Sequence, residues 1–399
     1  MEDTKSVKGI VKRGVTELVT QGLTFNDNVL DRKTNNYLAS IFFDDQKAGV
    51  AFLDLSTGEF MTAQGSKEYV AKLFQGFNPA EVILSKAHRT ELEHLFGDEY
   101  LTHAIDEWVY GSTFGYEKLV NHFNTNSLKG FGIEGMHQAI IAAGAVLHYL
   151  EETEHKEMGH ILSISRIDEE KYVWLDKFTI RNLELVYAQH DGGVPLIDIL
   201  DETITPMGSR LLKKWVVLPL KEISAIQDRL AMVSAFFDDQ ELLEQIRTYL
   251  KPIGDVERLI SKVAVGRINP REMGQLKKAL INTIPVKELL EQSKISELKK
   301  LADQINPCDF LLEKIDTTLK DDVPIVSNQG NIIKDGVDTE LDELRKIAFS
   351  GKDYLVQIQQ REVERTGIPS LKIAYNKVFG YYLEVSNAHK DKVPEEWIR

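Results

Sequence analysis

The segment DVERLISKVAVGRINPREMGQLKKAL, residues 255–280, predicts two helices that meet at a tight corner. Apolar residues in its first half recur at the three-and-four spacing of a single helix face: Val256, Leu259, Ile260 and Val263. Gly266 stands where the first helix is expected to end in a left-handed turn. The segment is therefore predicted to place one amphipathic helix directly before another.

The second helix of this corner has a complete set of start signals. Asn269 can accept a backbone N–H as the N-cap, Pro270 suits the first helical position, and Glu272 can complete a capping box. Its apolar face continues through Met273, Leu276, Ala279 and Leu280. The arginines of the segment, Arg258, Arg267 and Arg271, are interpreted as solvated or ion-paired residues that fix helix geometry.

Composition limits both the fold and the partners. The chain has 399 residues, of which 43% are hydrophobic, so two to four domains with buried cores are expected. Its 48 Lys and Arg against 62 Asp and Glu give a net charge of −14, which repels polyanions. Any nucleic acid would therefore have to meet a local surface of different charge.

Cysteine content and hydropathy indicate a cytoplasmic protein. The single cysteine, Cys308, excludes an intrachain disulfide and a multi-thiolate metal site. The first residues lack the apolar core of a signal peptide, and the apolar run at 139–150 is too short to span a bilayer. We expect no membrane association and no metal site.

The first half of the chain predicts a small α/β domain. Residues 1–30 are interpreted as a linker, after which strands are expected at 37–43, 48–55, 59–63, 80–85 and 100–105. Helices are expected near 66–76, 87–96, 112–123 and 134–153. Strands that alternate with helices are typical of an α/β fold.

The second half is predicted to be mainly helical. Amphipathic stretches occur near 176–186, 206–217, 223–238 and 239–250. A longer helix is expected over 338–365, about 40 Å at about 1.5 Å per residue, with a heptad-like apolar seam from Val337 to Ile358. After Gly367 and Pro369, alternating polarity predicts a β-hairpin.

Two short patterns are interpreted as structural. Gly130, Gly132 and Gly135 have dinucleotide-loop spacing, but no strand leads directly into them, so a glycine-rich turn before a helix is favoured. The E-x-x-H spacings at 91–94 and 152–155 lack the further inward carboxylates of a di-metal site, so solvated helix faces are favoured.

Asp54 supports an alternative function. A strand-borne carboxylate before Ser-Thr-Gly could hold Mg²⁺ in a nuclease of ribonuclease H-like fold, although the later strands offer only Glu81 and Glu99 as partners. A structural strand end is favoured. Phosphate-loop, G-x-S-x-G and H-E-x-x-H motifs do not occur, and no catalytic residue is predicted.

The hairpin is the candidate nucleic-acid site. It gathers donors and amphipathic rings on two strands: Lys372, Asn376, Lys377, Lys390, Tyr375, Tyr381 and Tyr382. Phosphate oxygens are bound by such exposed donors. Since Glu384, Glu395 and Glu396 dilute the charge, a plain surface hairpin is an equal alternative.

Four long segments together resemble the MutS family of DNA mismatch-repair proteins. They are KYVWLDKFTIRNLEL at 171–185, GGVPLIDILDETITPMGSRLLKKWVVLPL at 192–220, IGDVERLISKVAVGRINPRE at 253–272 and LKIAYNKVFGYYLEVSNAHKDKVPEEWIR at 371–399. The resemblance covers nearly the whole chain in the family's order.

The resemblance implies a multidomain fold that is α/β and then mainly α. It places a ribonuclease H-like connector at 31–155, a helical core with a lever helix at 160–360, and the start of a clamp at 361–399. The family's mismatch-reading and ATPase domains have no counterpart in this sequence. The chain is accordingly expected to be an excised middle piece that is not an enzyme, with ATP and Mg²⁺ confined to the missing ATPase domain.

The resemblance also implies partners and site residues. The clamp would grip double-stranded DNA weakly and without sequence preference, through Lys372, Asn376, Lys377 and Tyr381. The connector would dock a MutL-like protein, with Glu117 and Lys118 exposed on the helix near 112–123, and the family forms homodimers. A purely protein-interaction module is the remaining alternative.

Overall fold

The computed structural model describes residues 15, 17–24, 29–378 and 380–397. The chain divides into two units. The N-terminal unit comprises Met1–Asp316 with Asp321–Gly330, and the C-terminal unit comprises Thr317–Lys320 with Asn331–Arg399. Among the described helices, none combines the length and the apolar character needed to cross a membrane.

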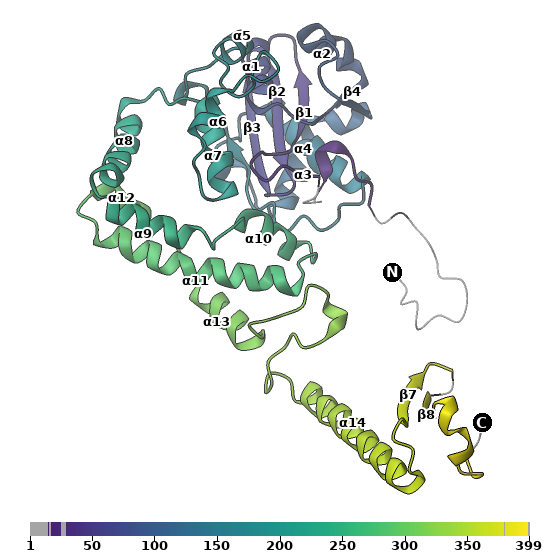
Figure 1. Cartoon of the computed structure of the whole chain (residues 1–399). Coiled ribbons are helices and arrows are strands. Elements are labelled where there is room, and N and C mark those ends of the chain that lie inside the picture. Colours follow the sequence, from purple (N-terminus) through teal and green to yellow (C-terminus); the bar gives the residue numbers. More distant parts are fainter. Residues whose placement is uncertain (1–14, 16, 25–28, 379, 398–399) are drawn as a thin grey trace. The chain divides into compact units, whose positions relative to one another are not determined.

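A six-stranded sheet forms the centre of the α/β domain in the N-terminal unit (Figure 1). Its strands are β1 (Tyr37–Phe43), β2 (Ala48–Asp54), β3 (Glu59–Gly65), β4 (Glu81–Ser85), β5 (Thr102–Ile105) and β6 (Ser165–Arg166). The order across the sheet is β5-β4-β1-β2-β3-β6. β1, β2 and β3 are antiparallel neighbours, while β4 runs parallel to β1 and β5 parallel to β4. The predicted mixed α/β domain is thus confirmed.

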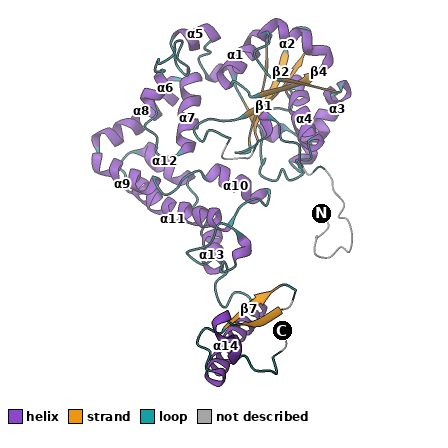
Figure 2. Cartoon of the chain, turned by 45° about the vertical axis from the view of Figure 1, so that its right-hand side comes forward, coloured by secondary structure: helices purple, strands orange, loops and turns teal. Residues whose placement is uncertain are grey.

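Helices cover both faces of this sheet, as the turned view in Figure 2 shows. One core lies between the sheet and helices α1 (Lys67–Phe77) and α2 (Arg89–Phe96). The other lies between the sheet and helices α3 (Ser112–His122) and α4 (His137–Glu152). Side chains alternate between the two cores along each strand, because successive strand residues point to opposite faces. α4 is apolar almost all round its circumference, as expected of a fully buried helix.

Glycines allow α4 to approach its neighbours closely. A Cβ atom on Gly144 would lie 2.4 Å from the Cα of Gly115 on α3, and one on Gly49 would lie 2.1 Å from the backbone carbon of Gln138. Any side chain at these positions would push the elements apart. The glycines at 130, 132 and 135 instead lie in the turn before α4, as predicted, and a Cβ there would meet nothing within 4 Å.

The described part of the segment predicted as a linker, residues 17–24, packs against the α/β domain, while most of residues 1–16 and residues 25–28 lie outside the described chain. The backbone N–H of Leu18 donates to the carbonyl of Thr153 (3.0 Å), and that of Gly22 donates to the Glu81 carboxylate (3.0 Å). Leu23 is fully buried. This segment therefore contributes to the core of the domain.

Nine helices follow the sheet along the chain between Lys177 and Thr318 in the part that the structure describes. They are α5 (Lys177–Asn182), α6 (Leu196–Leu200), α7 (Pro206–Val217), α8 (Ile223–Asp238), α9 (Gln240–Leu250), α10 (Val256–Ala264), α11 (Pro270–Gln292), α12 (Ser296–Gln304) and α13 (Asp309–Thr318). The helix predicted near 176–186 is shorter than expected, and α6, α12 and α13 were not predicted. A small core joins α9, α11 and α12.

The corner between α10 and α11 has the predicted capping but a different buried face. The Asn269 side chain accepts from the Glu272 N–H (2.9 Å) and the Glu272 carboxylate accepts from the Asn269 N–H (2.9 Å), while Gly266 has a φ of 65°. The predicted apolar face of α10 is wrong in part, because Ile260 and Val263 are exposed.

The buried face of α10 contains a charged side chain instead. Arg258 is 4% exposed and donates to the carbonyls of Asp31 (3.0 Å) and Thr34 (3.0 Å). Hydrogen bonds from the guanidinium therefore orient the helix, and apolar spacing alone could not reveal this. The interpretation of the arginine as a residue that fixes helix geometry is confirmed.

The C-terminal unit consists of the long helix α14 (Thr339–Thr366) and a hairpin of β7 (Lys372–Asn376) and β8 (Gly380–Glu384). The side chain of Asp338 caps the start of α14, and Gly367 ends it with a φ of 65°. Ile368 and Leu371 are buried where the chain turns from helix to strand. Both elements lie where the sequence predicted them.

Candidate functional site

The hairpin separates its predicted contact residues onto two faces. Residues paired across antiparallel strands point to the same side, and the pairs are Lys372 with Glu384, Ile373 with Leu383, Ala374 with Tyr382, Tyr375 with Tyr381, and Asn376 with Gly380. The rings of Tyr375 and Tyr381 lie 5.1 Å apart and are more than 60% exposed. Tyr381 thus shares an aromatic face with Tyr375, whereas Lys372 and Asn376 belong to the opposite face.

The turn of the hairpin presents Lys377 to solvent. The side-chain oxygen of Asn376 accepts a hydrogen bond from the backbone N–H of Val378 (2.8 Å), which is a local turn of the kind that Asn favours. Lys377, between these two residues, is exposed, as is Val378. Asn376 therefore shapes the turn, and Lys377 is the cation at its tip.

Lys372 is less suited than Lys377 to contact a phosphate group. It lies directly across the ladder from Glu384, so the two opposite charges partly neutralise each other. The segment from 371 to 392 nevertheless carries four lysines against two carboxylates, Glu384 and Asp391. The hairpin and the turn after it are therefore locally basic in a chain that is acidic overall.

A polar cluster that the sequence reasoning missed supports the base of the hairpin. The hydroxyl of Ser370 lies 3.0 Å from that of Ser386, and both hydroxyls lie 3.2 Å from Nδ1 of His389. Ser386 and His389 are three residues apart, but Ser370 reaches them only through the strand pairing. No local sequence signal could have predicted that contact.

The second predicted site, on α3, includes an aromatic group that the sequence reasoning also missed. Glu117 is exposed, but Lys118 is half-buried in an ion pair with Glu151, so its predicted exposure is wrong. Nearby, Trp108 is 59% exposed and its ring centroid lies 5.1 Å from that of Phe114. An exposed tryptophan beside charged groups is typical of a protein-binding surface.

The ring of His148 completes the aromatic group beside α3. Its centroid lies 5.1 Å from that of Trp108 and 5.4 Å from that of Phe114. The ammonium of Lys118 lies 5.9 Å from the Phe114 centroid. These side chains come from α3, α4 and the 3-10 helix Glu107–Tyr110, so only the tertiary structure brings them together.

Asp54 is a structural residue at the end of β2. It is fully buried, and one carboxylate oxygen accepts from the Ser56 hydroxyl (2.7 Å) and backbone N–H (3.0 Å). The other accepts from Nδ2 of Asn35 (2.8 Å) and the N–H of Asn36 (3.3 Å). Both oxygens are therefore engaged by donors of the chain.

The described residues offer no support for the nuclease alternative. They contain no group of three or more His, Cys, Asp or Glu side chains that could hold a metal ion. Of the two E-x-x-H spacings, Glu91 pairs with Lys67, and His155 with Glu17. The favoured interpretation of these motifs as solvated helix faces is wrong for His155, which is 6% exposed and follows the end of α4.

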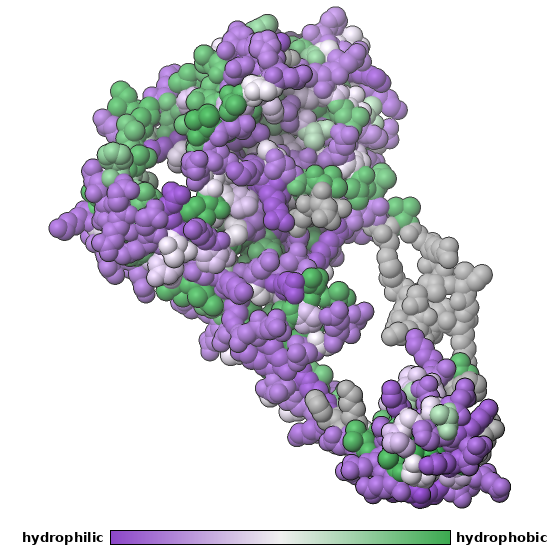
Figure 3. Space-filling view, in the orientation of Figure 1, coloured by the Kyte–Doolittle hydropathy of each residue, from purple (hydrophilic) through white to green (hydrophobic). Residues whose placement is uncertain are grey.

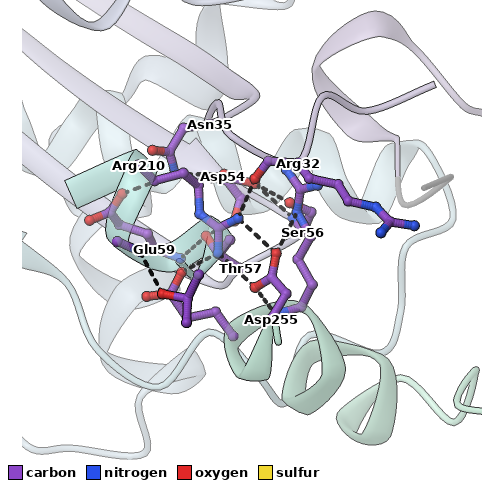
Figure 4. A network of polar contacts seen from close by, with 12 residues as sticks. Arg32, Asn35, Asp54, Ser56, Thr57, Glu59, Arg210 and Asp255 are labelled. Carbon is purple, nitrogen blue, oxygen red and sulfur yellow. Dashed lines mark hydrogen bonds and ion pairs between the residues drawn. The ribbon is translucent and has the colours of Figure 1, made fainter. Parts of the chain in front are cut away.

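A buried ion-pair network joins α7 and α10 to the edge of the α/β domain (Figure 4). Arg210 on α7 has a side chain that is 2% exposed. Its guanidinium forms a two-pronged pair with Asp255 (2.8 and 2.7 Å) and donates to the carbonyl of Arg32 (2.9 Å). It also pairs with Glu257 (2.5 Å). Burial opposes the charge on Arg210, but the two carboxylates outweigh it and raise the pKa of the guanidinium.

Two further ion pairs cross the junction between the α/β domain and α7 with the segment that leads into it. Lys214 pairs with Glu59 of β3, whose carboxylate accepts from the Tyr37 hydroxyl (2.7 Å). Burial and the Glu59 charge together raise the pKa of Tyr37 well above its usual value. Lys33 pairs with Asp201 (3.0 Å) before α7. The junction is thus held by charged groups from segments far apart in the sequence.

Asp201 anchors the segment that leads into α7. Its carboxylate accepts from the hydroxyls of Thr203 and Ser209 and from the Lys33 ammonium. Burial acts to raise its pKa, but these hydrogen bonds outweigh burial and lower the pKa to about 2. The carboxylate is therefore ionised in the folded protein throughout the neutral and mildly acidic range.

Exposed apolar side chains occur on α6, α7 and α8, and green areas lie over these helices in Figure 3. They include Leu196, Ile199, Leu200, Leu211, Trp215, Ile223, Leu230, Val233 and Phe237, which are all exposed. Single exposed apolar side chains are common on protein surfaces, so these residues alone do not define a binding site.

Comparisons with known proteins agree with the order of these elements. The sequence model described as MutS domain II matches residues 36–162, and that described as MutS domain III matches residues 178–389. The DNA mismatch repair protein MutS of Cytophaga hutchinsonii is 60% identical over 399 residues, which cover 100% of this chain and 47% of that protein. The proteins of the same name from Bacteroides fragilis and Flavobacterium psychrophilum are 54% and 52% identical, each over 100% of this chain and 46% of theirs. The chain therefore spans about half the length of these curated relatives.

Proposed function

The chain belongs to the MutS family, and we propose that it acts as the middle part of a mismatch-repair protein whose hairpin contacts the backbone of duplex DNA without reading its sequence. The observation that carries this proposal is the locally basic, exposed hairpin, with Lys377 at its tip and the Tyr375 and Tyr381 rings on one face. Exposed donors of this kind bind phosphate oxygens, which carry no sequence information.

The hairpin geometry ranks the proposed contacts. Lys377 comes first because it is exposed at the tip, and Tyr381 next because its hydroxyl and ring are exposed. Lys372 comes last because Glu384 lies opposite it, and Asn376 acts mainly by shaping the turn. Binding is expected to be weak and to fall with salt, since each phosphate contact releases counterions.

Anisotropy of a labelled duplex, titrated at several salt concentrations, tests this proposal. Lys377→Ala should weaken binding and reduce the slope of log K against log salt by about 1, because one phosphate contact is lost. Lys372→Ala should have a smaller effect. Lys278→Ala, on the exposed side of α11, is the matched control and should change nothing.

Two results would contradict the hairpin as the DNA contact. One is a Lys377→Ala variant that binds as tightly as the parent chain at every salt concentration. The other is a clear preference for mismatched over matched duplex, because a backbone contact cannot distinguish them. Metal-dependent cleavage by the pure protein that Asp54→Asn abolishes would instead restore the nuclease alternative.

The domain division is part of the same proposal. Residues 31–155 would be the connector, and the antiparallel β1-β2-β3 meander followed by parallel β4 and β5 supports a ribonuclease H-like topology for it. Residues 160–360 would be the core with α14 as the lever, and 361–399 the start of the clamp. In this scheme the core couples DNA binding to an ATPase domain elsewhere in the protein, and the protein forms a homodimer. We therefore propose no ATP or Mg²⁺ site in this part of it.

A MutL-like protein is the proposed partner of the α/β domain. Trp108, whose ring lies edge-to-face with the rings of Phe114 and His148, supports this surface together with exposed Glu117. Trp108→Ala should lower affinity for the partner by about tenfold or more, because an exposed tryptophan at the centre of an interface is a frequent hot spot. Surface plasmon resonance measures this effect.

The matched control for the partner surface is Trp215→Ala. Trp215 is also partly exposed, but it lies on α7 under the guanidinium of Arg229, at 3.6 Å from the ring centroid. Equal losses in the two tryptophan variants would argue against a surface centred on Trp108. A chain that binds the partner but ignores DNA at every salt concentration would favour the pure interaction module.

A further inference from the structure

A cavity of about 220 Å³ lies in the N-terminal unit where α7 packs beside the loop that follows α1. Three cations of α7 line it: Arg210, Lys213 and Lys214. Among the described residues that line the cavity there is no aspartate or glutamate. A chain with a net charge of −14 therefore contains a small hollow whose charged lining is entirely basic.

Lys213 differs from the other two cations in its partners. Arg210 and Lys214 each pair with carboxylates outside the cavity lining. Lys213 has no carboxylate oxygen within 4 Å among the described residues, and its ammonium lies 5.5 Å from the ring centroid of Tyr187. A half-buried ammonium without a counterion is costly, because desolvation disfavours its charge.

This environment shifts the pKa of the Lys213 ammonium. Burial lowers the pKa of Lys213, and the carboxylates of Asp31 and Asp198 oppose that effect only in part. An anion in contact with the ammonium would reverse it. The electrostatic surroundings of Lys213 therefore favour an anionic ligand.

Further hydrogen-bond donors belong to residues that line the same cavity. Nε of Arg210 is buried and has no hydrogen-bond partner, although both terminal nitrogens of the guanidinium are engaged. Such an orphan donor normally indicates a bound water or ion. Tyr187 and Asn78 also line the cavity, with the Asn78 amide donating to the Tyr187 hydroxyl (3.0 Å), so that hydroxyl keeps its own proton to donate.

We propose that this cavity binds a small oxyanion of the inorganic phosphate class, with Lys213 as its cation and the Arg210 guanidinium and Tyr187 hydroxyl as further donors. The volume is below the roughly 300–1,000 Å³ of sites for drug-sized ligands, so a complete nucleoside triphosphate does not fit inside. The bound anion connects α7 to the loop after α1 and stabilises the folded junction by mass action.

Isothermal titration with inorganic phosphate, at ionic strength matched with chloride, tests the site. Phosphate should bind the parent chain, and Lys213→Met should lower its affinity about tenfold or more, as expected for loss of a charge-assisted contact. Lys278→Met removes the same charge from an exposed helix and should leave phosphate binding unchanged. Tyr187→Phe should cause a smaller loss than Lys213→Met.

Thermal melts separate loss of the site from loss of the fold. Phosphate should raise the melting temperature of the parent chain but not that of Lys213→Met, whose melting temperature without phosphate should match the parent. Absence of phosphate binding to the parent, or equal binding by Lys213→Met, would overturn the proposal. Tighter Lys213-dependent binding of ATP than of phosphate would also overturn it, because the ligand would then be a nucleotide.

Discussion

The α/β domain buries most of its apolar residues, whereas the C-terminal unit leaves many of its apolar residues exposed. In the α/β domain, both faces of the sheet are filled by the helices that follow its strands, and α4 is buried almost all round. In the C-terminal unit, the apolar seam of α14 is largely exposed, with Leu344 at 57%, and the buried apolar side chains lie at Ile368 and Leu371. One part of the chain thus completes its own core, and the other leaves much of its apolar surface exposed.

The same contrast extends to charged residues. Arg210 is buried in a network that connects distant segments, whereas Arg365 and Glu396 in the C-terminal unit form an exposed pair. Buried pairs are costly to break and exposed pairs are not. Substitutions matched between the two regions can therefore test whether stability depends on the junction of the α/β domain.

Arg210→Leu is expected to have the largest effect. Removal of the guanidinium leaves the carboxylates of Asp255 and Glu257 without their buried partner, and breaking such a pair costs about 3–5 kcal/mol. Urea denaturation followed by tryptophan fluorescence measures the loss. Glu396→Gln, in an exposed pair, should cost at most about 1 kcal/mol, and a similar loss in both variants would contradict the comparison.

Gly144→Ala should be nearly as damaging. The new methyl group would overlap the backbone of Gly115, so α3 and α4 would have to separate, at about 1–3 kcal/mol or more. Gly130→Ala, where a Cβ meets nothing within 4 Å, is the control and should stay within about 0.5 kcal/mol of the parent. Thermal melts measured by circular dichroism would reveal the difference, and equal melting temperatures would argue against the close helix contact.

The carboxylate of Asp201 predicts a dependence of stability on pH. Its pKa in the folded protein is about 2, below the usual value near 4, so its contribution is present above about pH 4 and is lost as pH falls towards 2. Asp201→Asn should lower stability by about 1–3 kcal/mol at pH 7, and this deficit should shrink between pH 4 and 2. Urea titrations at several pH values measure it. A deficit that is constant with pH would show that ionisation is not the cause.

Gly351→Ala should have the smallest effect and the opposite sign. Gly351 is an exposed residue within α14, and a Cβ there meets nothing within 4 Å. Alanine should stabilise the helix by about 1 kcal/mol, because glycine is the poorer helix former. The helical signal of α14 should melt at a higher temperature, while the α/β domain should melt as before. A loss of helicity would instead indicate that the seam requires glycine at this position.

The sequence by itself determined most elements, because their signals are local. The capping box of Asn269 and Glu272, the helix-ending turn at Gly266, the strands of the meander and the hairpin are all predicted by residues within a few positions of each other. The resemblance of four long segments identified the family, which composition and residue spacing alone could not do.

Only the tertiary structure decided which side chains meet across those elements. Arg258 replaces Ile260 and Val263 on the buried face of α10 because carbonyls of a distant segment accept its hydrogen bonds. Trp108 likewise contacts Phe114 of α3 and His148 of α4 only because the fold brings these elements together. Periodicity records which residues are apolar, but a buried charge depends on partners far along the chain, and local sequence carries no information about them.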